Sequence, residues 1–208
     1  MENRATVNWD DRYQAGDTPW DKGAAAPPLL EWMSIHGALT GEILVPGCGL
    51  GHDVRAIASA DLNTQVIGLD VARTAVERAS ALPKTGSETY QAADLFDLPS
   101  DLNARFDWVF EHTCFCAIEP SRRADYALAA ASALKPHGHL LAIFYLNPWD
   151  PGEEPDGGGP PFGVTLSELD QLFSPHFALV ESLKPTSAFP GREGREVIYV
   201  LQKHGTMR

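Results

Sequence analysis

The sequence predicts an α/β fold in which helices cover both faces of an open, doubly wound and mostly parallel sheet. Short apolar runs alternate with alanine-rich helical stretches along the chain, which is the rhythm of repeated strand–helix–strand units. A glycine-rich turn, Gly47-Cys48-Gly49-Leu50-Gly51, also stands directly after one apolar run and before a helical stretch. A chain of 208 residues has the length of one such domain with extensions, so we expect a single domain over residues 1–208.

The elements of the first half follow from local signals. The helices are rich in alanine and in long unbranched residues, and Pro83 ends the third of them. The strands are short segments rich in apolar or β-branched residues. In chain order, the expected ranges are helix 26–37, strand 42–45, helix 53–60, strand 65–69, helix 72–82 and strand 89–92.

The second half continues the alternation and ends in two strands. A turn is expected at 135–138, where the sequence Lys-Pro-His-Gly is typical of a chain reversal. Thr165 and Glu168 have the spacing of a capping box, which predicts the start of a helix. The last two strands flank a loop of proline, glycine and arginine and are expected to form an antiparallel hairpin. The expected ranges are strand 106–110, helix 122–134, strand 139–145, helix 165–173, strand 177–183 and strand 196–202.

The net charge and the cysteines of the sequence limit which binding partners and which cellular compartment are expected. The 28 acidic residues exceed the 16 basic ones and give a net charge of −12 without any basic run, so no nucleic-acid partner is expected. The apolar stretches are far shorter than the ~20 residues of a membrane-spanning helix, so no membrane partner is expected. Three cysteines without framework spacing and a polar N-terminus predict a cytoplasmic protein, with a monomer as the default state.

The glycine turn predicts a ligand site. Glycines at 47, 49 and 51 permit a tight turn and let a ligand approach the backbone, while the following helix offers a positive dipole end to a phosphate or a carboxylate. Asp70 ends the next strand, 19 residues beyond Gly51, which is the position of a ribose-binding acid in nucleotide-binding units. Asp94 and Leu95 follow the third strand and would suit an adenine amino group and ring, although Asp94 capping a turn is an equally good interpretation.

The spacing of these glycines separates two classes of nucleotide user. Dehydrogenases usually have G-x-G-x-x-G, whereas Gly47-x-Gly49-x-Gly51 is the tighter pattern associated with S-adenosylmethionine. In that arrangement the amino-acid carboxylate of the ligand takes the place of a pyrophosphate. A nicotinamide-dependent dehydrogenase and a binding module that senses the nucleoside without turnover remain as alternatives.

Two sequence blocks resemble one family. Val45-Pro46-Gly47-Cys48-Gly49 and Phe115-Cys116-Ala117-Ile118-Glu119-Pro120 are similar to the thiopurine S-methyltransferase family, and in particular to its plant-type branch of halide and thiol methyltransferases. The resemblance covers residues 9–203. It implies a Rossmann-like, class I methyltransferase fold with a seven-stranded sheet and an antiparallel last strand, and S-adenosylmethionine as the cofactor.

The resemblance also implies which residues contact the cofactor. An aromatic lid, residues 1–25, would lie over it. Tyr13 stands where the plant-type pattern has a tryptophan, and His112 stands where it has a tyrosine. The implied contacts are Trp9, Tyr13 and Trp20 in the lid, Gly47 in the turn, Asp70 at the ribose, Asp94 and Leu95 at the adenine, and His112 after the fourth strand.

The lid residues suit the expected chemistry. A sulfonium is a cation, and aromatic faces attract cations by ~0.5–2 kcal/mol, so the lid could hold the cofactor and exclude water. Packing of an N-terminal helix on the core is the alternative. Methyl transfer is an in-line displacement that mainly requires alignment of the nucleophile with the methyl group. His112 is the one titratable side chain placed to assist a thiol, and its other roles would be a wall contact or a structural one.

The acceptor is expected to be a small soft nucleophile, either a thiol or thiopurine or a halide-like anion such as thiocyanate. Residues 147–163 are rich in proline, glycine and acids and predict a loop on the substrate side. Substrate contacts are expected from Tyr145, Trp149 and Phe162 as an apolar wall and from Arg192 and Arg195 as an attraction for anions, against the alternatives of packing and a solvated pair. No metal is expected, because His112, Cys114 and Cys116 lack a fourth ligand.

Overall fold

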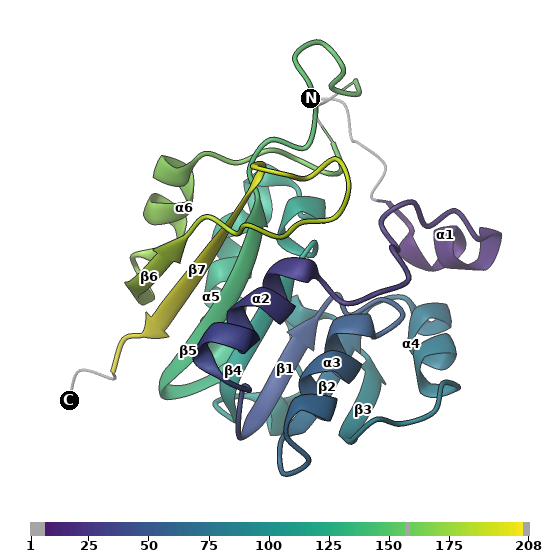
Figure 1. Ribbon diagram of the computed structural model, residues 1–208, viewed down its shortest axis with the longest axis vertical. Coiled ribbons are helices and arrows are strands. Elements are labelled where there is room, and N and C mark those ends of the chain that lie inside the picture. The colour runs from purple at the N-terminus through teal and green to yellow at the C-terminus, as the bar shows by residue number, and fades with distance from the viewer. Residues whose placement is uncertain (1–6, 157–158, 206–208) are drawn as a thin grey trace.

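The computed structural model describes residues 7–156 and 159–205, and its centre is a seven-stranded sheet (Figure 1). The strands are β1 (Glu42–Pro46), β2 (Gln65–Asp70), β3 (Ser87–Ala92), β4 (Phe106–His112), β5 (Leu134–Tyr145), β6 (Phe177–Leu183) and β7 (Glu196–Lys203). Their order across the sheet is β3-β2-β1-β4-β5-β7-β6. The pairs from β3 to β5 are parallel, and β7 runs antiparallel to both β5 and β6. The predicted sheet and its antiparallel last strand are confirmed.

Helices cover both faces of this sheet, as predicted. They are α1 (Trp9–Ala15), α2 (Pro27–His36), α3 (His52–Ala60), α4 (Arg73–Ser80), α5 (Arg123–Ala133) and α6 (Leu166–Phe173). Figure 1 shows α2 and α3 in front of the sheet and α5 behind it. Strand residues alternate between the two faces, so Ile43 and Val45 join the core under α2 and α3 while Leu44 joins the core under α5 and α6.

Most predicted elements lie within a few residues of the observed ones. Thr165 accepts a hydrogen bond from the N–H of Glu168, and the Glu168 carboxylate accepts one from the N–H of Thr165, so the capping box is confirmed. The sequence interpretation did not assign α1 as an element. It also missed four short 3-10 turns, at Leu95–Asp97, Ser100–Leu102, Phe115–Ala117 and Pro120–Arg122.

The predicted turn at 135–138 is wrong as a strand boundary. Those residues lie inside β5, where Phe106 of β4 pairs with Leu134 and Trp108 pairs with His139. Because two steps on β4 therefore match five steps on β5, the extra residues bulge out of the ladder. His137 has a φ of 63° in this bulge, which explains why the local sequence has the composition of a turn.

Two loops follow the carboxyl ends of the strands. The segment 147–163 contains no helix or strand in its described residues, as predicted, and positions 157–158 lie outside the described residues. The loop between β6 and β7 crosses above α2 (Figure 1). Glu31 of α2 ties it down by accepting hydrogen bonds from the N–H groups of Thr186 (3.0 Å) and Ser187 (2.6 Å). Residues 1–6 of the expected lid also lie outside the described residues.

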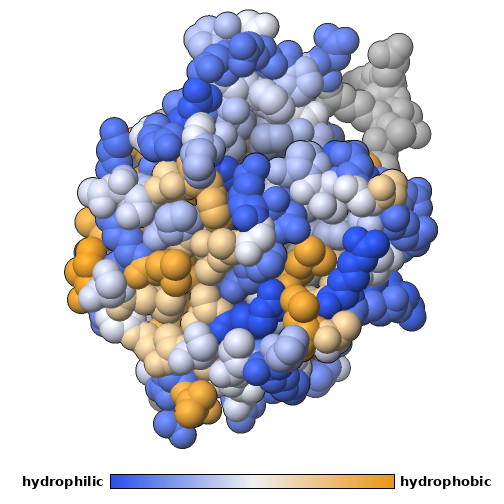
Figure 2. All heavy atoms as spheres, turned by 45° about the vertical axis from the view of Figure 1, so that its right-hand side comes forward, coloured by the Kyte–Doolittle hydropathy of each residue, from blue (hydrophilic) through white to orange (hydrophobic). Residues whose placement is uncertain are grey.

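The surface carries scattered apolar side chains. On the face drawn in Figure 2, hydrophobic patches are separated by hydrophilic residues. Large exposed hydrophobic side chains include Leu30 and Ile35 on α2 and Leu179 and Val180 on β6. Across the described ranges, no helix is both long enough and apolar enough to cross a membrane.

Candidate active site

A cavity of about 660 Å³ opens at the carboxyl edge of the sheet, where β1 points upward in Figure 1. Its lining includes the glycine turn after β1, the ends of β2 and β4, and α1. The strand order reverses between β1 and β4, because β1 leads to β2 and β3 on one side while β4 leads to β5 on the other. Ligands of open α/β sheets bind at such a switch point, and the volume is that of a small-molecule site.

The glycine turn shapes the floor of this cavity. Gly47 and Gly49 have φ angles of 59° and 51°, which side chains rarely adopt. A Cβ at Gly47 would lie 2.7 Å from Sγ of Cys114, and one at Gly49 would lie 2.8 Å from the Tyr13 hydroxyl. The N–H of Gly49 donates to Asp70, and the N–H of Cys48 donates to the carbonyl of Leu69. The turn therefore lets a ligand come close to the backbone. The N–H groups of Gly49 and Cys48, however, already donate hydrogen bonds within the protein.

Asp70 joins the end of β2 to the glycine turn. Its Oδ2 accepts the N–H of Gly49 at 2.8 Å, and its Oδ1 accepts the N–H of Ala72 at 2.9 Å. Burial raises the pKa of Asp70, while the two N–H groups act in the opposite direction. A carboxylate oxygen has two lone pairs, so this side chain, which lines the cavity, can still accept hydrogen bonds from a ligand.

Asp94 and Leu95 also line the cavity. Asp94 is the N-cap of the 3-10 turn Leu95–Asp97, and its Oδ1 accepts the N–H of Phe96 at 2.9 Å. The turn-capping alternative is thus realised. It does not exclude ligand contact, because the capped turn holds Leu95 at the cavity wall.

Three aromatic side chains close one end of the cavity. The ring centroids of Trp9 and Trp20 are 5.3 Å apart and those of Tyr13 and Trp20 are 5.7 Å apart, both in edge-to-face geometry. The indole N–H of Trp20 donates to the hydroxyl of Tyr13 at 3.0 Å. Tyr13 is only 4% exposed, and burial raises the pKa of its hydroxyl. These rings pack on one another and also line the cavity, so packing and a contact with a ligand are compatible.

Two polar contacts attach this aromatic segment to the sheet domain. Asp10 of α1 accepts the N–H of Thr74 at the start of α4, at 2.7 Å. Nε2 of His52, the first residue of α3, lies 3.0 Å from a carboxylate oxygen of Asp21. The aromatic segment is therefore attached to both α3 and α4.

His112 lies at the other end of the cavity, where β4 ends. Its Nδ1 is 3.0 Å from Oδ2 of Asp53, and its Nε2 is 3.3 Å from Nη1 of Arg192. Arg192 lies over the ring of Tyr145 at 4.7 Å, and both residues line the cavity. Glu196 of β7 forms an ion pair with Arg192 at 3.3 Å, and Glu196 is not itself a cavity-lining residue.

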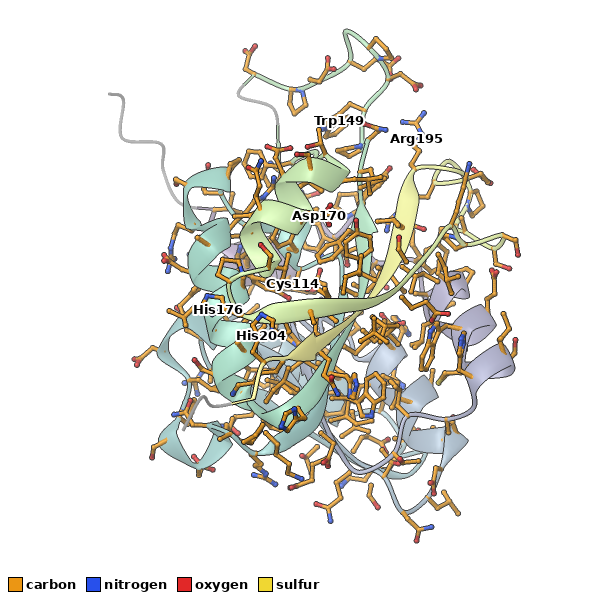
Figure 3. The ribbon with its side chains drawn as sticks, turned by 90° about the vertical axis from the view of Figure 1, so that its left-hand side faces the viewer. Cys114, Trp149, Asp170, His176, Arg195 and His204 are labelled. Atoms are coloured by element: carbon orange, nitrogen blue, oxygen red, sulfur yellow. The ribbon has the colours of Figure 1, made fainter. Side chains whose placement is uncertain are left out.

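The predicted substrate residues divide into two groups. Tyr145, Trp149 and Arg192 line the cavity, and the indole N–H of Trp149 donates to the carbonyl of Pro161 at 2.9 Å. Phe162 and Arg195 are not among the lining residues. Figure 3 shows Trp149 and Arg195 near the same end of the molecule, but their partners differ.

Phe162 and Arg195 instead fix the loops that surround the cavity. The N–H of Phe162 donates to the carbonyl of Cys116 at 2.7 Å, and its carbonyl accepts from the guanidinium of the buried Arg123 at 3.0 Å. Arg195 forms an ion pair with Asp150 and donates to the carbonyl of Asn147. The backbone of Phe162 and the side chain of Arg195 thus anchor residues 147–163 to the rest of the structure.

Sequence reasoning overlooked three residues of this site. Asp53 and Phe189 line the cavity, and Glu196 is buried behind it. Asp53 stands two residues after Gly51 of the glycine turn, and Glu196 is an acid at the start of an apolar strand, so each carried a local indication in the sequence. Phe189 lies in a loop without periodicity and carried none.

Glu111 and Tyr126 form a buried polar pair next to the site. The Tyr126 hydroxyl donates to Glu111, which also accepts the N–H groups of Cys114 (3.1 Å) and Phe115 (2.8 Å). Burial raises the pKa of Glu111 to about 7. This carboxyl fixes the turn that follows His112 and so helps to place that ring.

The cysteines are free thiols, and burial raises the pKa of Cys48, Cys114 and Cys116. Protonated thiols are poor nucleophiles and poor metal ligands. Within residues 7–156 and 159–205, no group of three or more histidine, cysteine, aspartate or glutamate side chains is arranged to hold a metal ion.

The whole arrangement fits a nucleoside ligand that carries an amino-acid group and a positive charge. The volume suits such a molecule, Asp70 can accept from a ribose, and a close-packed backbone turn borders the aromatic rings. A Cβ at Gly47 or Gly49 would meet neighbouring side chains, so these positions require glycine.

Comparisons with known proteins agree with this geometry. A family model described as thiopurine S-methyltransferase matches residues 4–204. A probable thiol methyltransferase 2 from Arabidopsis thaliana is 34% identical over 212 residues, covering 99% of this chain and 89% of that protein. Thiocyanate methyltransferase 1 from Brassica oleracea is 35% identical over 194 residues, covering 90% of this chain and 81% of that protein.

Solved structures share the fold at lower identity. A 1,6-didemethyltoxoflavin-N1-methyltransferase from Burkholderia thailandensis, solved with bound 1,6-didemethyltoxoflavin and S-adenosylhomocysteine, gives a TM-score of 0.68 at 20% identity. The match covers 93% of this chain and 84% of that one. The chain belongs to the thiopurine S-methyltransferase family and is therefore a methyltransferase that uses S-adenosylmethionine as its methyl donor.

Proposed function

We propose that this enzyme methylates a small soft nucleophile, either a thiol or thiopurine or a halide-like anion such as thiocyanate. The observation that carries the proposal is the continuous cavity of about 660 Å³, which extends from the aromatic lid and glycine turn to His112 and Arg192. Donor and acceptor can therefore share one space.

The donor end would use the residues that line the first part of the cavity. S-adenosylmethionine, when bound, supplies a methyl carbon activated by a positively charged sulfur leaving group. Asp70 would accept the ribose hydroxyls, and the backbone of Gly47 and Gly49 would border the amino-acid group. Trp9, Tyr13 and Trp20 would lie over the cofactor, and Asp94 with Leu95 would contact the adenine.

The acceptor end would use His112, Tyr145, Trp149 and Arg192. Tyr145 and Trp149 would supply apolar walls, and Arg192 would orient a polarisable sulfur or anion near the end of β4. The enzyme's main task is alignment, because the reaction is an in-line displacement at an already activated carbon. Residues 147–163 would close this side as a substrate loop.

The names of the two relatives support a sulfur-centred acceptor. One is a probable thiol methyltransferase and the other a thiocyanate methyltransferase, each covering more than four fifths of its own length in the comparison. We further infer a cytoplasmic monomer that acts on small molecules and not on nucleic acid. Its free thiols and its net charge of −12 support that inference.

A methyl-transfer assay tests the proposal. The protein is incubated with S-adenosylmethionine labelled in the methyl group and, separately, with a small thiol, a thiopurine, iodide and thiocyanate. We expect labelled methyl product from at least one of these acceptors, and inhibition by added S-adenosylhomocysteine. Tight binding of S-adenosylhomocysteine without any methylated product would contradict the proposal and favour the sensor alternative.

A further inference from the structure

A cluster of four charged or titratable side chains lies at the acceptor end of the cavity. It consists of Asp53 from α3, His112 from β4, Arg192 from the β6–β7 loop and Glu196 from β7. Their side chains are 17%, 8%, 10% and 1% exposed, respectively. Four separate segments of the chain thus bring ionisable groups together where solvent is largely excluded, which is costly unless the charges are paired and hydrogen-bonded.

The contact with Asp53 fixes the tautomer of His112. A carboxylate only accepts hydrogen bonds, so Nδ1 of His112, 3.0 Å from Oδ2 of Asp53, must carry the hydrogen. In the neutral ring, Nε2 then holds the lone pair, and the guanidinium of Arg192 is its long-range donor at 3.3 Å. The other oxygen of Asp53 accepts the N–H of Ala26 at 2.7 Å, which holds the carboxylate in place.

On the opposite side of the ring, Nε2 of His112 lies near the side chains of Arg192 and Glu196. Nε2 of His112 is 3.3 Å from Nη1 of Arg192, longer than the usual N–H hydrogen bond of about 2.7–3.2 Å, and 4.0 Å from Oε1 of Glu196. Oε2 of Glu196 is buried without a hydrogen-bond partner in the part of the chain that the structure describes. Phe189 stacks on the imidazole with ring centroids 6.3 Å apart and so limits its rotation.

The charges of the cluster do not balance while His112 is neutral. Asp53 and Glu196 carry two negative charges against the single positive charge of Arg192. Glu111, on the same strand as His112, also interacts with it electrostatically. Burial raises the pKa of Glu196, whereas the charges of His112 and Arg192 lower it. One added proton neutralises Asp53, His112, Arg192 and Glu196 as a set, whereas an added anion increases the imbalance.

We propose that this cluster selects a thiol in its protonated form and that Nε2 of His112 receives the thiol proton, with Asp53 as a positioning residue. The inference rests on the proposed function and names the acceptor within it. The S–H bond breaks as the proton moves to Nε2, and the sulfur forms a bond to the methyl carbon. The bond from that carbon to the sulfonium breaks, and its electron pair stays on the sulfur of S-adenosylhomocysteine.

Iodide and thiocyanate would gain nothing from this cluster. They are nucleophiles without a proton to give, and each would bring a further negative charge into a buried group that already has an excess of one. The thiol and the anions therefore depend on His112 to different degrees, which makes the inference testable.

The experiment compares His112→Asn with the wild-type protein. Asparagine retains an N–H group that can donate to Asp53 but cannot take up a proton. We measure kcat/KM for ethanethiol and for thiocyanate between about pH 6 and pH 10. We expect the thiol value to fall by ~10²–10⁴-fold in the variant near neutral pH and to recover as the pH approaches the thiol pKa, because the thiolate then needs no base. The thiocyanate value should change by less than about ten-fold.

Asp53→Asn and His204→Gln complete the set. Asp53→Asn should reproduce the altered pH profile for the thiol more weakly, since it leaves the imidazole present but without its fixed tautomer. His204 follows the end of β7 farthest from Trp149 (Figure 3), so His204→Gln should leave both acceptors unchanged.

Three outcomes would overturn the inference. Equal losses for both acceptors in His112→Asn would make His112 a wall or folding residue. Wild-type turnover of thiocyanate or iodide without turnover of thiols would also overturn it, while leaving the proposed methylation of a soft nucleophile intact. Failure of every acceptor, despite binding of S-adenosylhomocysteine, would instead overturn the proposed function and this inference with it.

Discussion

At the scale of single residues, Asp70 has two tasks that a substitution separates. Its carboxylate accepts N–H groups from the glycine turn and from Ala72, and it faces the cavity. Asp70→Asn keeps the size but replaces one acceptor oxygen by a donor. We expect calorimetry to show affinity for S-adenosylhomocysteine reduced by ~1.5–3 kcal/mol, the range for a hydrogen bond to a charged group. Asp101→Asn, at an exposed position that does not line the cavity, is the matched control, and unchanged affinity in folded Asp70→Asn would remove Asp70 from the ribose role.

Glu111 makes stability depend on pH. Burial raises its pKa from an ordinary value of 4.5 to about 7, so the folded protein keeps a proton that the unfolded chain releases. The stabilisation from this group is full below about pH 4.5 and is lost as the pH rises through about 7. Glu111→Gln should remove that part of the dependence, which amounts to about 3 kcal/mol at most.

Urea unfolding at about pH 5 and about pH 8 measures the difference. The free energy of unfolding of the wild type should fall more between these conditions than that of Glu111→Gln. The exposed Glu77 provides the control variant Glu77→Gln, which should follow the wild type. The same pH dependence in Glu111→Gln as in the wild type would show that Glu111 is already ionised in the folded protein.

The residues that sequence reasoning placed correctly in the cavity are those with local signals. Gly47, Gly49 and Asp70 stand at the ends of strands whose pattern was readable, and their positions followed from the sheet geometry. Phe162 and Arg195 are residue types common in binding sites, yet the backbone carbonyl of Phe162 accepts a hydrogen bond from Arg123, and Arg195 pairs with Asp150. Such partners are distant in sequence, so no local pattern reveals them.

At the scale of elements, the aromatic lid predicts a preference for the charged ligand. Trp20 contacts both Trp9 and Tyr13, so Trp20→Ala opens this end of the cavity. A sulfonium attracted to aromatic faces should lose ~0.5–2 kcal/mol more than the uncharged product. We expect the dissociation constant of S-adenosylmethionine to rise more than that of S-adenosylhomocysteine, as measured by calorimetry.

Tyr13→Phe is the control for this comparison. It keeps the edge-to-face ring contact with Trp20 and loses only the hydroxyl that accepts the indole N–H. Its effect on both ligands should be smaller than that of Trp20→Ala. Equal losses for the two ligands in Trp20→Ala would show that the lid packs without sensing charge.

The β6–β7 loop depends on α2. Glu31 holds Thr186 and Ser187, and the same loop carries Phe189 and Arg192 to the acceptor end. Glu31→Ala should raise the KM of the acceptor by about three- to ten-fold, because the loop loses its anchor. Affinity for S-adenosylhomocysteine should stay within about two-fold of wild type. Glu181→Ala, on β6, is the control, and an unchanged acceptor KM in Glu31→Ala would contradict the anchoring role.

The prediction of helices and strands succeeded where the hydrophobic periodicity was strong. It failed where pairing with a distant strand determines the local structure. The buried strands and the capping box of α6 follow from the sequence alone. The segment 135–138 has the composition of a turn, but Leu134 and His139 on either side of it both pair with β4, which keeps it inside β5 as a bulge. The N-terminal helix α1 could be considered only without bounds, because its seven residues are too few to show a helical period.

At the scale of the whole molecule, the net charge of −12 affects anionic acceptors differently from neutral ones. The field of the protein repels thiocyanate and iodide, and salt screens that field. We expect kcat/KM for thiocyanate to rise as ionic strength increases from about 20 mM to about 200 mM. The value for neutral ethanethiol should stay constant over the same range, and a fall for thiocyanate would show that local positive charge at Arg192 outweighs the overall field.

The fold and the cavity-lining residues near the glycine turn were largely predictable from sequence, whereas the charged cluster around His112 was only partly so. Alternation of strands and helices, together with the glycine turn, determines the sheet order and places the cavity at its switch point. The cluster of Asp53, His112, Arg192 and Glu196 brings together residues that are far apart in the sequence. Asp53 and Glu196 are separated by 143 positions. Their proximity results from the crossing of four elements and has no signature in any short window of sequence.

The most direct test of the account is calorimetric titration of the purified protein with S-adenosylhomocysteine. The account predicts saturable binding of one molecule per chain, accompanied by a rise in thermal unfolding temperature, because a ligand that binds only the folded state stabilises it. The absence of both binding heat and stabilisation, in protein shown to be folded, would contradict the assignment of the cavity to this cofactor and every functional conclusion that depends on it.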